Sequence, residues 1–368
     1  MSMGFLRRLF GISSGLSFFA WQVEMTTRCP LQCRMCIREA QRGWRPADMP
    51  IDKFRKLAPY FGLVENTVLQ GWGEPLMHPH LIDAIRIVKD NGSRPGFVTS
   101  GWGLDTSMVA ELAGNGLDFI GFSLAGATPK THDAIRRNSH LPAVLDAICE
   151  FNRFKADNRR ETPRMHIVFL MLKDNIAEIP MLLDLARRVG IDVVMLINLI
   201  QVSDAWQDDQ KVFSCGRGEA WAVIEEARIK AKELDIALQI SSLNPEVTAV
   251  CGDDPLRNLF IAIDGQVSPC VYLHPPVPSP VKRIFCGEPV SVEKLSFGNI
   301  FDEPLEQIWT GQDYVAFRSQ FQKRRDFVAS HPYDSIASPE IERLMPGGGV
   351  ALPEPPAPCL TCHRRLGL

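Results

Sequence analysis

Three cysteines in the first forty residues have the spacing of ligands for a metal centre. Cys29, Cys33 and Cys36 lie within eight residues, and Pro30 prevents a helix from running through the first of them. We therefore expect the three sulfurs on a loop that curls round one object. Thiolates suit zinc or an iron-sulfur cluster. A structural zinc site needs four ligands, whereas three ligands on a four-iron cluster leave one iron open to a small molecule with an amine and a carboxylate.

Four later cysteines have the spacing of ligands for a second cluster. Cys251 and Cys270 are 19 residues apart, and Cys359 and Cys362 form a C-x2-C pair. Four thiolates saturate a 4Fe–4S cluster, so such a cluster would have no iron open to a small molecule. Cys286 is the ambiguous fifth cysteine of this region. It either replaces one of the four ligands or is a buried, small apolar side chain.

The two other cysteines have different expected roles. Cys149 lies on the apolar face of a predicted helix, so we expect it to pack in the core. Cys215 lies in the 211–218 loop after the sixth predicted strand. It either faces the substrate or is an ordinary loop residue.

The composition is that of a globular protein with room for two domains. The chain has 368 residues and a net charge of −3, so its charge balance does not favour a nucleic-acid partner. No apolar stretch is long enough to span a membrane, and we expect no membrane contact. The apolar run within residues 5–19 continues directly into a predicted strand, so we expect a cytoplasmic protein rather than a secreted one. In that compartment ten cysteines favour metal binding or catalysis over disulfides.

Short β-rich runs alternate with helical segments from residue 18 to about residue 241. This order is typical of βα units around a parallel sheet. Six such units are too few for a closed eightfold barrel, so we predict the α/β class with a partial (β/α)6 barrel. A doubly wound sheet is the alternative. The strands are expected at residues 17–25, 63–70, 94–100, 117–124, 164–172 and 191–199.

Beyond residue 242, Pro and Gly become frequent and regular helices become rare. We expect a β-hairpin with a type I′ turn at Asp264–Gly265, and one amphipathic helix over residues 303–325 that is broken near Gly311. The predicted division is an N-terminal segment, a partial barrel and a small auxiliary domain built from a hairpin and a helix, at residues 1–17, 18–241 and 242–368.

The first cysteine group resembles the C-x3-C-x-φ-C signature of the radical S-adenosylmethionine (radical SAM) enzymes. The cysteine spacing matches in full, and Met35 stands where the family more often has an aromatic residue beside the adenine. The segment Gly71–Pro75 is similar to the family's G-G-E-P segment, which binds the amino group of SAM, although Trp72 replaces one Gly. Glu74 at a strand end suits an ammonium group, and the flanking glycines allow close backbone approach.

Two further segments resemble the family in the same order. Thr99–Ser100 ends the third predicted strand, and Ser123 ends the fourth within a segment like the ribose-contacting S-L-D-G, whose Asp is Ala125 here. All these segments lie at the carboxyl ends of successive strands, where parallel barrels build their active sites. The resemblance implies SAM contacts from Met35, Gly73, Glu74, Pro75, Thr99, Ser100 and Ser123.

The resemblance also implies two 4Fe–4S clusters. One binds SAM and is held by the first three cysteines; the other is auxiliary and is held by Cys251, Cys270, Cys359 and Cys362, in an extension like those of the SPASM and Twitch subclasses. A full SPASM extension holds two auxiliary clusters and needs more than the five cysteines of this tail. The one-cluster Twitch pattern therefore fits better.

The implied chemistry is reductive cleavage of SAM to a 5′-deoxyadenosyl radical, which takes hydrogen from a substrate C–H bond. The electron would come from a carrier such as flavodoxin or ferredoxin. We interpret the chain as an oxidoreductase that performs a two-electron oxidation, with the auxiliary cluster as electron acceptor. Only about 17 residues precede the first strand, which favours a small-molecule substrate over a peptide bound by a recognition domain.

Several alternatives remain. The enzyme could modify a peptide or protein, form a C–C bond, or act as an epimerase in which the Cys215 thiol donates a hydrogen atom. A non-enzymatic iron-sulfur electron carrier is the alternative from another class. Such a carrier would not need Glu74 or Ser123.

Overall fold

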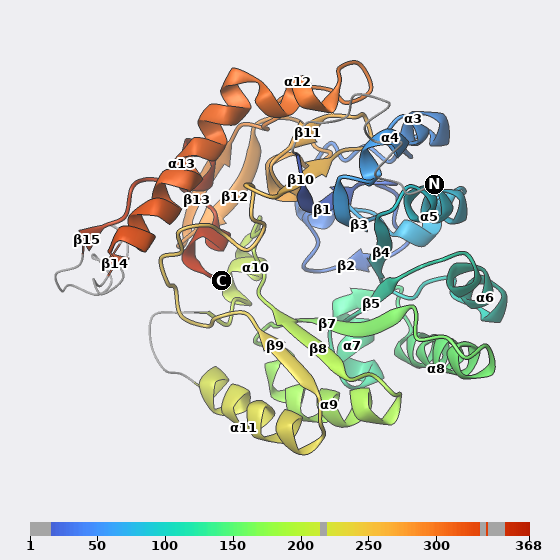
Figure 1. Cartoon of the computed structure of the whole chain (residues 1–368). Helices are drawn as coiled ribbons and strands as arrows, with labels where there is room; N and C mark the ends of the chain where they lie inside the picture. The colour runs from blue at the N-terminus through green and yellow to red at the C-terminus, as the bar shows by residue number, and fades with distance from the viewer. Residues whose placement is uncertain (1–15, 214–218, 332–335, 338–349) are drawn as a thin grey trace.

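The computed structural model of the chain describes residues 16–213, 219–331, 336–337 and 350–368 (Figure 1). The predicted loop residue Cys215 and most of the predicted N-terminal segment lie outside these residues. No helix in this described part is long and apolar enough to cross a membrane.

One open sheet of nine strands organises the molecule. Its order is β11-β10-β1-β3-β4-β5-β7-β8-β9, and every neighbouring pair is parallel except β10 with β11. The sheet curves with its helices on the outside (Figure 1). The strands are β1 (Phe18–Val23), β3 (Val64–Val68), β4 (Arg94–Thr99), β5 (Phe119–Leu124), β7 (Arg164–Leu170), β8 (Val193–Ile197), β9 (Ala237–Ile240), β10 (Asn258–Ile261) and β11 (Val267–Ser268).

The six predicted strands and the open α/β architecture are confirmed. The structure adds β9, which extends the parallel sheet beyond β8, and it pairs β10, the first strand of the predicted hairpin, with β1 on the other side. Both lie near or beyond the predicted domain boundary at residue 241. The division of the chain at that residue stays a prediction, because β10 and β11 share one sheet with the barrel strands.

Helices cover the outer face of the sheet. Two of them, α6 and α7, begin at capping side chains: Asp105 accepts a hydrogen bond from Met108 N, and Thr128 accepts one from Thr131 N. Phe122 of β5 packs edge-on against Phe151 of a covering helix. The helices are α2 (Ile37–Ala40), α3 (Ile51–Arg55), α4 (Ala58–Phe61), α5 (Leu81–Asp90), α6 (Thr106–Gly114), α7 (Pro129–Ile135), α8 (Leu141–Asp157), α9 (Ile179–Arg188), α10 (Ala205–Asp209), α11 (Glu219–Glu233), α12 (Leu305–Thr310) and α13 (Gln312–Ser330).

The predicted hairpin exists, but its turn differs from the expected type I′. The N–H of Gly265 bonds to the carbonyl of Ala262 at 2.9 Å, and Gly265 has a φ of +86° while Asp264 is not in the left-handed region. This is a type I turn closed by a left-handed Gly. A pair of left-handed residues occurs instead at Cys286 and Gly287, between β12 (Val281–Phe285) and β13 (Glu288–Val292).

The C-terminal helices pack against the first strand. The predicted break at Gly311 is confirmed, since it separates α12 from α13. Trp309 of α12 lies edge-on to Phe18 of β1, with ring centroids 4.7 Å apart. Two pairs of short strands complete the described structure: β2 (Gln32–Cys33) with β6 (Arg136–Arg137), and β14 (Ile336–Ala337) with β15 (Val350–Ala351).

A buried arginine on α13 joins three separate segments. Arg324 donates Nε to the carbonyl of Ala249 at 3.0 Å, Nη2 to that of Thr248 at 2.7 Å, and Nη1 to that of Pro353. The guanidinium thus holds the chain leading to Cys359 against the segment just before Cys251.

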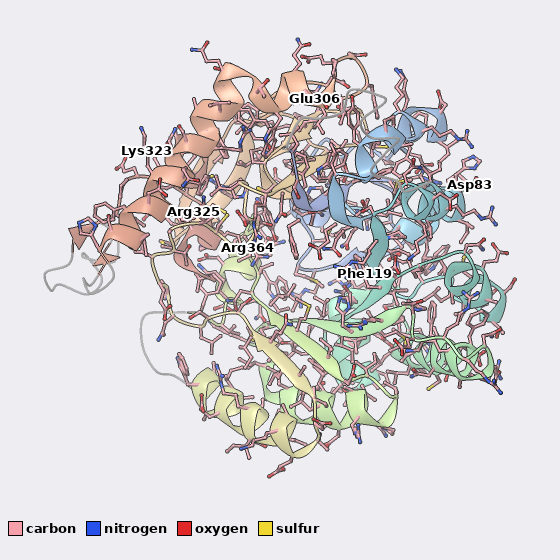
Figure 2. The ribbon with its side chains drawn as sticks, viewed as in Figure 1. Asp83, Phe119, Glu306, Lys323, Arg325 and Arg364 are labelled. Atoms are coloured by element: carbon pink, nitrogen blue, oxygen red, sulfur yellow. The ribbon has the colours of Figure 1, made fainter. Side chains whose placement is uncertain are left out.

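We predict that Arg324→Met lowers the thermal unfolding midpoint by several degrees. Three carbonyls lose their donor, and each unsatisfied group costs about 1–3 kcal/mol. Differential scanning calorimetry of the iron-loaded protein measures the change. Arg325→Met, at an exposed position of the same helix (Figure 2), is the matched control. Equal midpoints for the two variants would contradict the prediction.

Candidate active site

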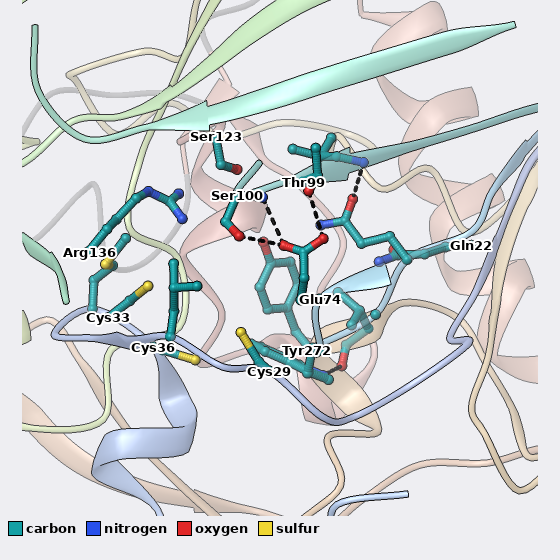
Figure 3. A pocket seen from close by; sticks show the side chains of 18 of the residues that line it. Gln22, Cys29, Cys33, Cys36, Glu74, Thr99, Ser100, Ser123, Arg136 and Tyr272 are labelled. Carbon is teal, nitrogen blue, oxygen red and sulfur yellow. Dashed lines mark hydrogen bonds between the residues drawn. The ribbon is translucent and has the colours of Figure 1, made fainter. Parts of the chain in front are cut away.

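One cavity of about 390 Å³ brings the predicted site residues together at the carboxyl ends of β1, β3, β4 and β5 (Figure 3). All three N-terminal cysteines line it, and so do Met35, Gly73, Glu74, Thr99, Ser100 and Ser123. Pro75 does not line the cavity; it is buried and begins a 3₁₀ turn behind Glu74. Nine of the ten site residues that we predicted for the barrel therefore line this cavity.

The cysteine loop is held in place by backbone hydrogen bonds. Cys33 of β2 is paired antiparallel with Arg136 of β6, and Cys36 donates its N–H to the carbonyl of Cys33 at 3.0 Å. Arg38 donates Nη1 to the carbonyl of Cys29 at 2.6 Å. The loop that Pro30 was expected to impose is thus a fixed turn with its thiols toward the cavity (Figure 3).

Burial raises the pKa of each thiol in this loop, and that of Cys36 to about 12. The Arg136 and Arg38 guanidinium groups oppose this rise at Cys33. Buried thiols stay protonated at neutral pH until a metal replaces the proton, so metal loading would release protons. No three Cys, His, Asp or Glu side chains of the described residues could hold a single metal ion. An iron-sulfur cluster needs thiols that are farther apart than the ligands of a single ion, since each thiolate binds a different iron.

Glu74 is buried at the centre of a hydrogen-bond network. Its Oε1 accepts from Thr99 Oγ1 at 2.7 Å, and its Oε2 accepts from Ser100 N at 2.8 Å and Ser100 Oγ at 2.7 Å (Figure 3). Burial raises the pKa of Glu74, and these hydrogen bonds oppose the rise. Oε1 also accepts from Leu76 N at 3.3 Å, so donors of the chain already occupy both acceptor positions of each oxygen, and a bound ammonium would replace or share one of these bonds. Thr99 and Ser100 orient Glu74; whether they also touch SAM stays a prediction.

Glu24 supports the same loop and was missed by the sequence reasoning. It follows β1, is buried, and accepts a hydrogen bond from Trp72 N at 2.9 Å through Oε1. A Cβ at Gly71 would lie 2.3 Å from that carboxylate, and one at Gly73 would lie 2.3 Å from the carbonyl of Thr26. Both glycines are therefore needed for close approach. Burial raises the pKa of Glu24 to about 8.

Charged side chains without a sequence signature also line the cavity. The Nε of Arg136 is buried and has no hydrogen-bond partner among the described residues, so it can bind an anionic group. The opposite wall comes from the C-terminal region: Asp253 Oδ2 lies 3.4 Å from Arg364 Nε, and Tyr272 lies beside them. Only the folded chain brings these residues together, so no sequence spacing could reveal them.

The four predicted auxiliary ligands form a second group. Burial raises the pKa values of Cys251, Cys270 and Cys359, and neighbouring thiols of the same group add to the rise, as expected of thiols that lie close together. Arg283 was missed by the sequence reasoning. It donates Nη2 to Pro358 O at 2.7 Å and to Thr361 Oγ1 at 2.6 Å, and so fixes the turn that carries the last two cysteines.

Three other cysteines have different outcomes. Cys286 is exposed in the β12–β13 turn, so its prediction as a buried side chain is wrong; its role as a ligand stays untested. Cys149 is also exposed and not in the core, because the preceding residues Ala147 and Ile148 take the buried positions of α8. Cys215 lies outside the described residues, so its predicted role as hydrogen donor has no structural test.

Comparisons with known proteins identify both regions. Residues 23–200 match the model of the radical SAM superfamily, and residues 251–330 match that of SPASM, an iron-sulfur cluster-binding domain. A "tungsten-containing aldehyde ferredoxin oxidoreductase cofactor-modifying protein" of Pyrococcus furiosus is 28% identical over 302 residues, which are 80% of this chain and 82% of that protein. A PqqA peptide cyclase of Methylobacterium nodulans is 24% identical over 291 residues, covering 78% and 71% of the two chains.

Solved structures share the fold. Streptococcus suis SuiB bound to the precursor peptide SuiA matches with a TM-score of 0.62 at 16% identity, over 85% of this chain and 69% of that one. The anSMEcpe structure with bound AdoMet and Cp18Cys peptide matches with a TM-score of 0.60 at 12% identity, over 82% of each chain. At such identities the likeness shows the fold alone.

We predict that Glu24→Gln increases the free energy of unfolding relative to the wild type, and that this difference grows as the pH rises from 5 to 8. Between about pH 4.5 and pH 8 the unfolded chain ionises Glu24 while the folded chain keeps it protonated. The free energy of unfolding therefore falls with rising pH, by up to about 1.4 kcal/mol per unit from this group. The amide removes this loss and keeps an acceptor for Trp72 N.

Thermal midpoints of the wild type and the variant, measured at each pH, check the prediction. Glu65→Gln, at an exposed position of β3, is the control. A difference between Glu24→Gln and the wild type that does not change with pH would contradict it.

Proposed function

Because this chain belongs to the radical SAM superfamily and carries a SPASM domain, we propose that it performs a SAM-dependent two-electron oxidation of a small molecule at a C–H bond. One observation carries the proposal: three thiols, a buried carboxylate and an unpartnered guanidinium face one cavity at the carboxyl ends of four strands. The thiols can hold an iron-sulfur cluster, and the carboxylate and the guanidinium are partners for the amino and carboxylate groups of SAM. A simple electron carrier would need only the thiols.

We assign the iron ligands of the SAM-binding cluster to Cys29, Cys33 and Cys36. When bound, this cluster supplies the electron that cleaves SAM to methionine and a 5′-deoxyadenosyl radical, which takes hydrogen from the substrate. Glu74 holds the SAM ammonium, since it is the buried carboxylate of the cavity, and Arg136 holds the SAM carboxylate, since its buried Nε has no ion pair with Asp253 as Arg364 has. Ser123 contacts the ribose.

The substrate would lie against the wall formed by Asp253, Tyr272 and Arg364. This wall is continuous in sequence with the auxiliary ligands, because Asp253 is two residues after Cys251 and Arg364 is two residues after Cys362. A substrate radical at this wall is therefore close to the auxiliary cluster, which would accept its second electron. We propose one auxiliary cluster, on the four thiols that influence one another.

Charged and hydroxyl groups at this wall suit a small polar substrate. The name of the Pyrococcus furiosus relative, a cofactor-modifying protein, supports a substrate of this kind. Peptide modification is the second candidate. It is favoured by the PqqA peptide cyclases among the relatives and by the peptide-bound SuiB structure of the same fold.

We predict that Cys359→Ala/Cys362→Ala keeps SAM cleavage and loses product. The wild type should contain about eight irons and the variant about four, because each cluster has four. Hydrogen abstraction needs only the first site, whereas the oxidation needs an electron acceptor. Iron content and 5′-deoxyadenosine are measured directly, and oxidised product is sought by mass spectrometry in a metabolite extract. A variant with four irons that still forms product at the normal rate would remove the acceptor role and favour a redox-neutral reaction.

We also predict that Glu74→Ala weakens SAM binding by about 1.5–3 kcal/mol, the value of a charge-assisted hydrogen bond at a buried site. Equilibrium binding of SAM to the iron-loaded variant measures this loss. Glu74→Gln keeps an acceptor for Thr99 but not the negative charge. It therefore distinguishes the effect of the charge on SAM binding from the effect of the lost hydrogen bonds. Unchanged SAM affinity in both variants would refute the assignment of Glu74.

A further inference from the structure

A further cavity, of about 460 Å³, shares no lining residue with the candidate active site. We call it the second cavity. Its lining is apolar in part, with Ile263 and Val277 among the apolar residues. Its charged or titratable lining residues are Glu24, Arg45, Asp264, His274 and Lys294.

Hydrogen bonds between distant segments fix the walls of the second cavity. Glu24 N donates to the carbonyl of Ile261 at 2.9 Å, at the end of the ladder that pairs β1 with β10. Arg45 N donates to the carbonyl of Pro276 at 3.3 Å. The cavity is therefore formed by the fold of three separate segments and not by a single surface loop.

The second cavity adjoins the loop that carries Glu74. Glu24 lines the second cavity and accepts a hydrogen bond from the backbone of Trp72, which lines the first. Val277 packs in one apolar cluster with Trp72 and Cys36. A ligand in the second cavity would therefore contact side chains that support the candidate active site.

Two cations of the second cavity have no partner in the described part of the chain. Neither the Arg45 guanidinium nor the Lys294 ammonium makes an ion pair or a hydrogen bond there, although Asp264 lines the same cavity. Burial lowers the pKa of Lys294; Asp264 opposes this change, and the nearby positive charge of Arg45 adds to it. An anion placed between the two cations would relieve their repulsion.

The two other titratable groups do not oppose an anion near neutral pH. Burial raises the pKa of Glu24 to about 8, so its carboxyl group stays protonated. Glu24 Oε2 is buried without a hydrogen-bond partner among the described residues, and the N–H of Ile263 lies near the carboxyl group but outside hydrogen-bond geometry. Burial lowers the pKa of His274, so its ring is neutral. Over the same described residues, these side chains are not arranged to hold a metal ion.

We propose that the second cavity binds a small organic anion, in which an apolar body is joined to a carboxylate or a phosphate group. The anionic group would lie between Arg45 and Lys294, and the apolar body would lie against Ile263 and Val277. The inference goes beyond the proposed function and does not depend on it, because binding here needs neither SAM nor a substrate radical.

The first test compares simple probes by isothermal titration of the iron-loaded protein. Benzoate and phenyl phosphate carry the same ring with a carboxylate or a phosphate, inorganic phosphate has no ring, and phenol has no charge at neutral pH. Benzoate or phenyl phosphate should bind saturably and more tightly than the other two probes, because only these supply both a charge and an apolar body. The tighter of the two identifies the anionic group.

The second test measures the tighter probe on variants. Arg45→Gln/Lys294→Gln should weaken its binding at least about tenfold, the effect of one lost charge-assisted hydrogen bond. Asp264→Asn keeps an acceptor for Gln266 N but removes a negative charge from the cavity, so it should tighten binding. The control, Arg187→Gln/Lys232→Gln, changes exposed residues of α9 and α11 at the far end of the sheet (Figure 1) and should bind like the wild type.

Three outcomes would overturn the proposal. The first is the absence of saturable binding of every anion up to millimolar concentrations, and the second is an affinity of Arg45→Gln/Lys294→Gln equal to that of the wild type. The third is a loss of binding in Arg136→Gln alone, which would place the anion in the first cavity. Thermal midpoints of the variants verify that they are folded. None of these measurements uses SAM cleavage, so their failure would leave the proposed function standing.

Discussion

The parallel pairing of β1 with two partners is the constraint on which both halves of the site depend. β3 lies on one side of β1 and β10 on the other, so three strands from distant parts of the chain end at one edge. The segment after β1 carries the first cysteines, that after β3 carries Glu74, and that after β10 leads to Cys270 and Tyr272. Pairing of β10 with β1 thus brings Tyr272, two residues after Cys270, into the cavity that Glu74 also lines. The domain boundary predicted at residue 241 separates strands that belong to this one sheet.

Two buried carboxylates hold the strand ends in register. Glu24 follows β1 and accepts from the backbone of Trp72, while Glu74 accepts from both residues that end β4. Each bond joins loops from different strands, so the two acids connect β1, β3 and β4 in series. Both are buried at a cost in desolvation that their backbone donors partly offset. The local arrangement of the cavity is therefore built from polar contacts, and the apolar core lies behind it.

Long apolar strands and short cysteine spacings were predictable because each depends on neighbours in sequence. β9 was missed because it has only four residues, with alternate ones exposed, and lacks the continuous apolar run of a central strand. The turn at Gly265 differed because Asp264–Gly265 fits two turn types, and the choice between them depends on the flanking backbone. Arg136, Asp253 and Arg364 acquire meaning only when the folded chain brings them to one cavity, and no local pattern marks such residues.

The auxiliary thiols also impose an order on biosynthesis. Cys270 and Cys359 are separated by 89 residues, and Arg283, which fixes the turn bearing Cys359, lies between them. At about 5–20 residues per second, a ribosome needs about 4–18 s to add that stretch. During this interval Cys251 and Cys270 are already made but Cys359 and Cys362 are not, whereas the three N-terminal cysteines, Glu74 and Ser123 are all complete. A nascent chain can therefore complete its barrel site first. The thiols of Cys251 and Cys270 stay without their partners until the segment with Cys359 and Cys362 has been synthesised.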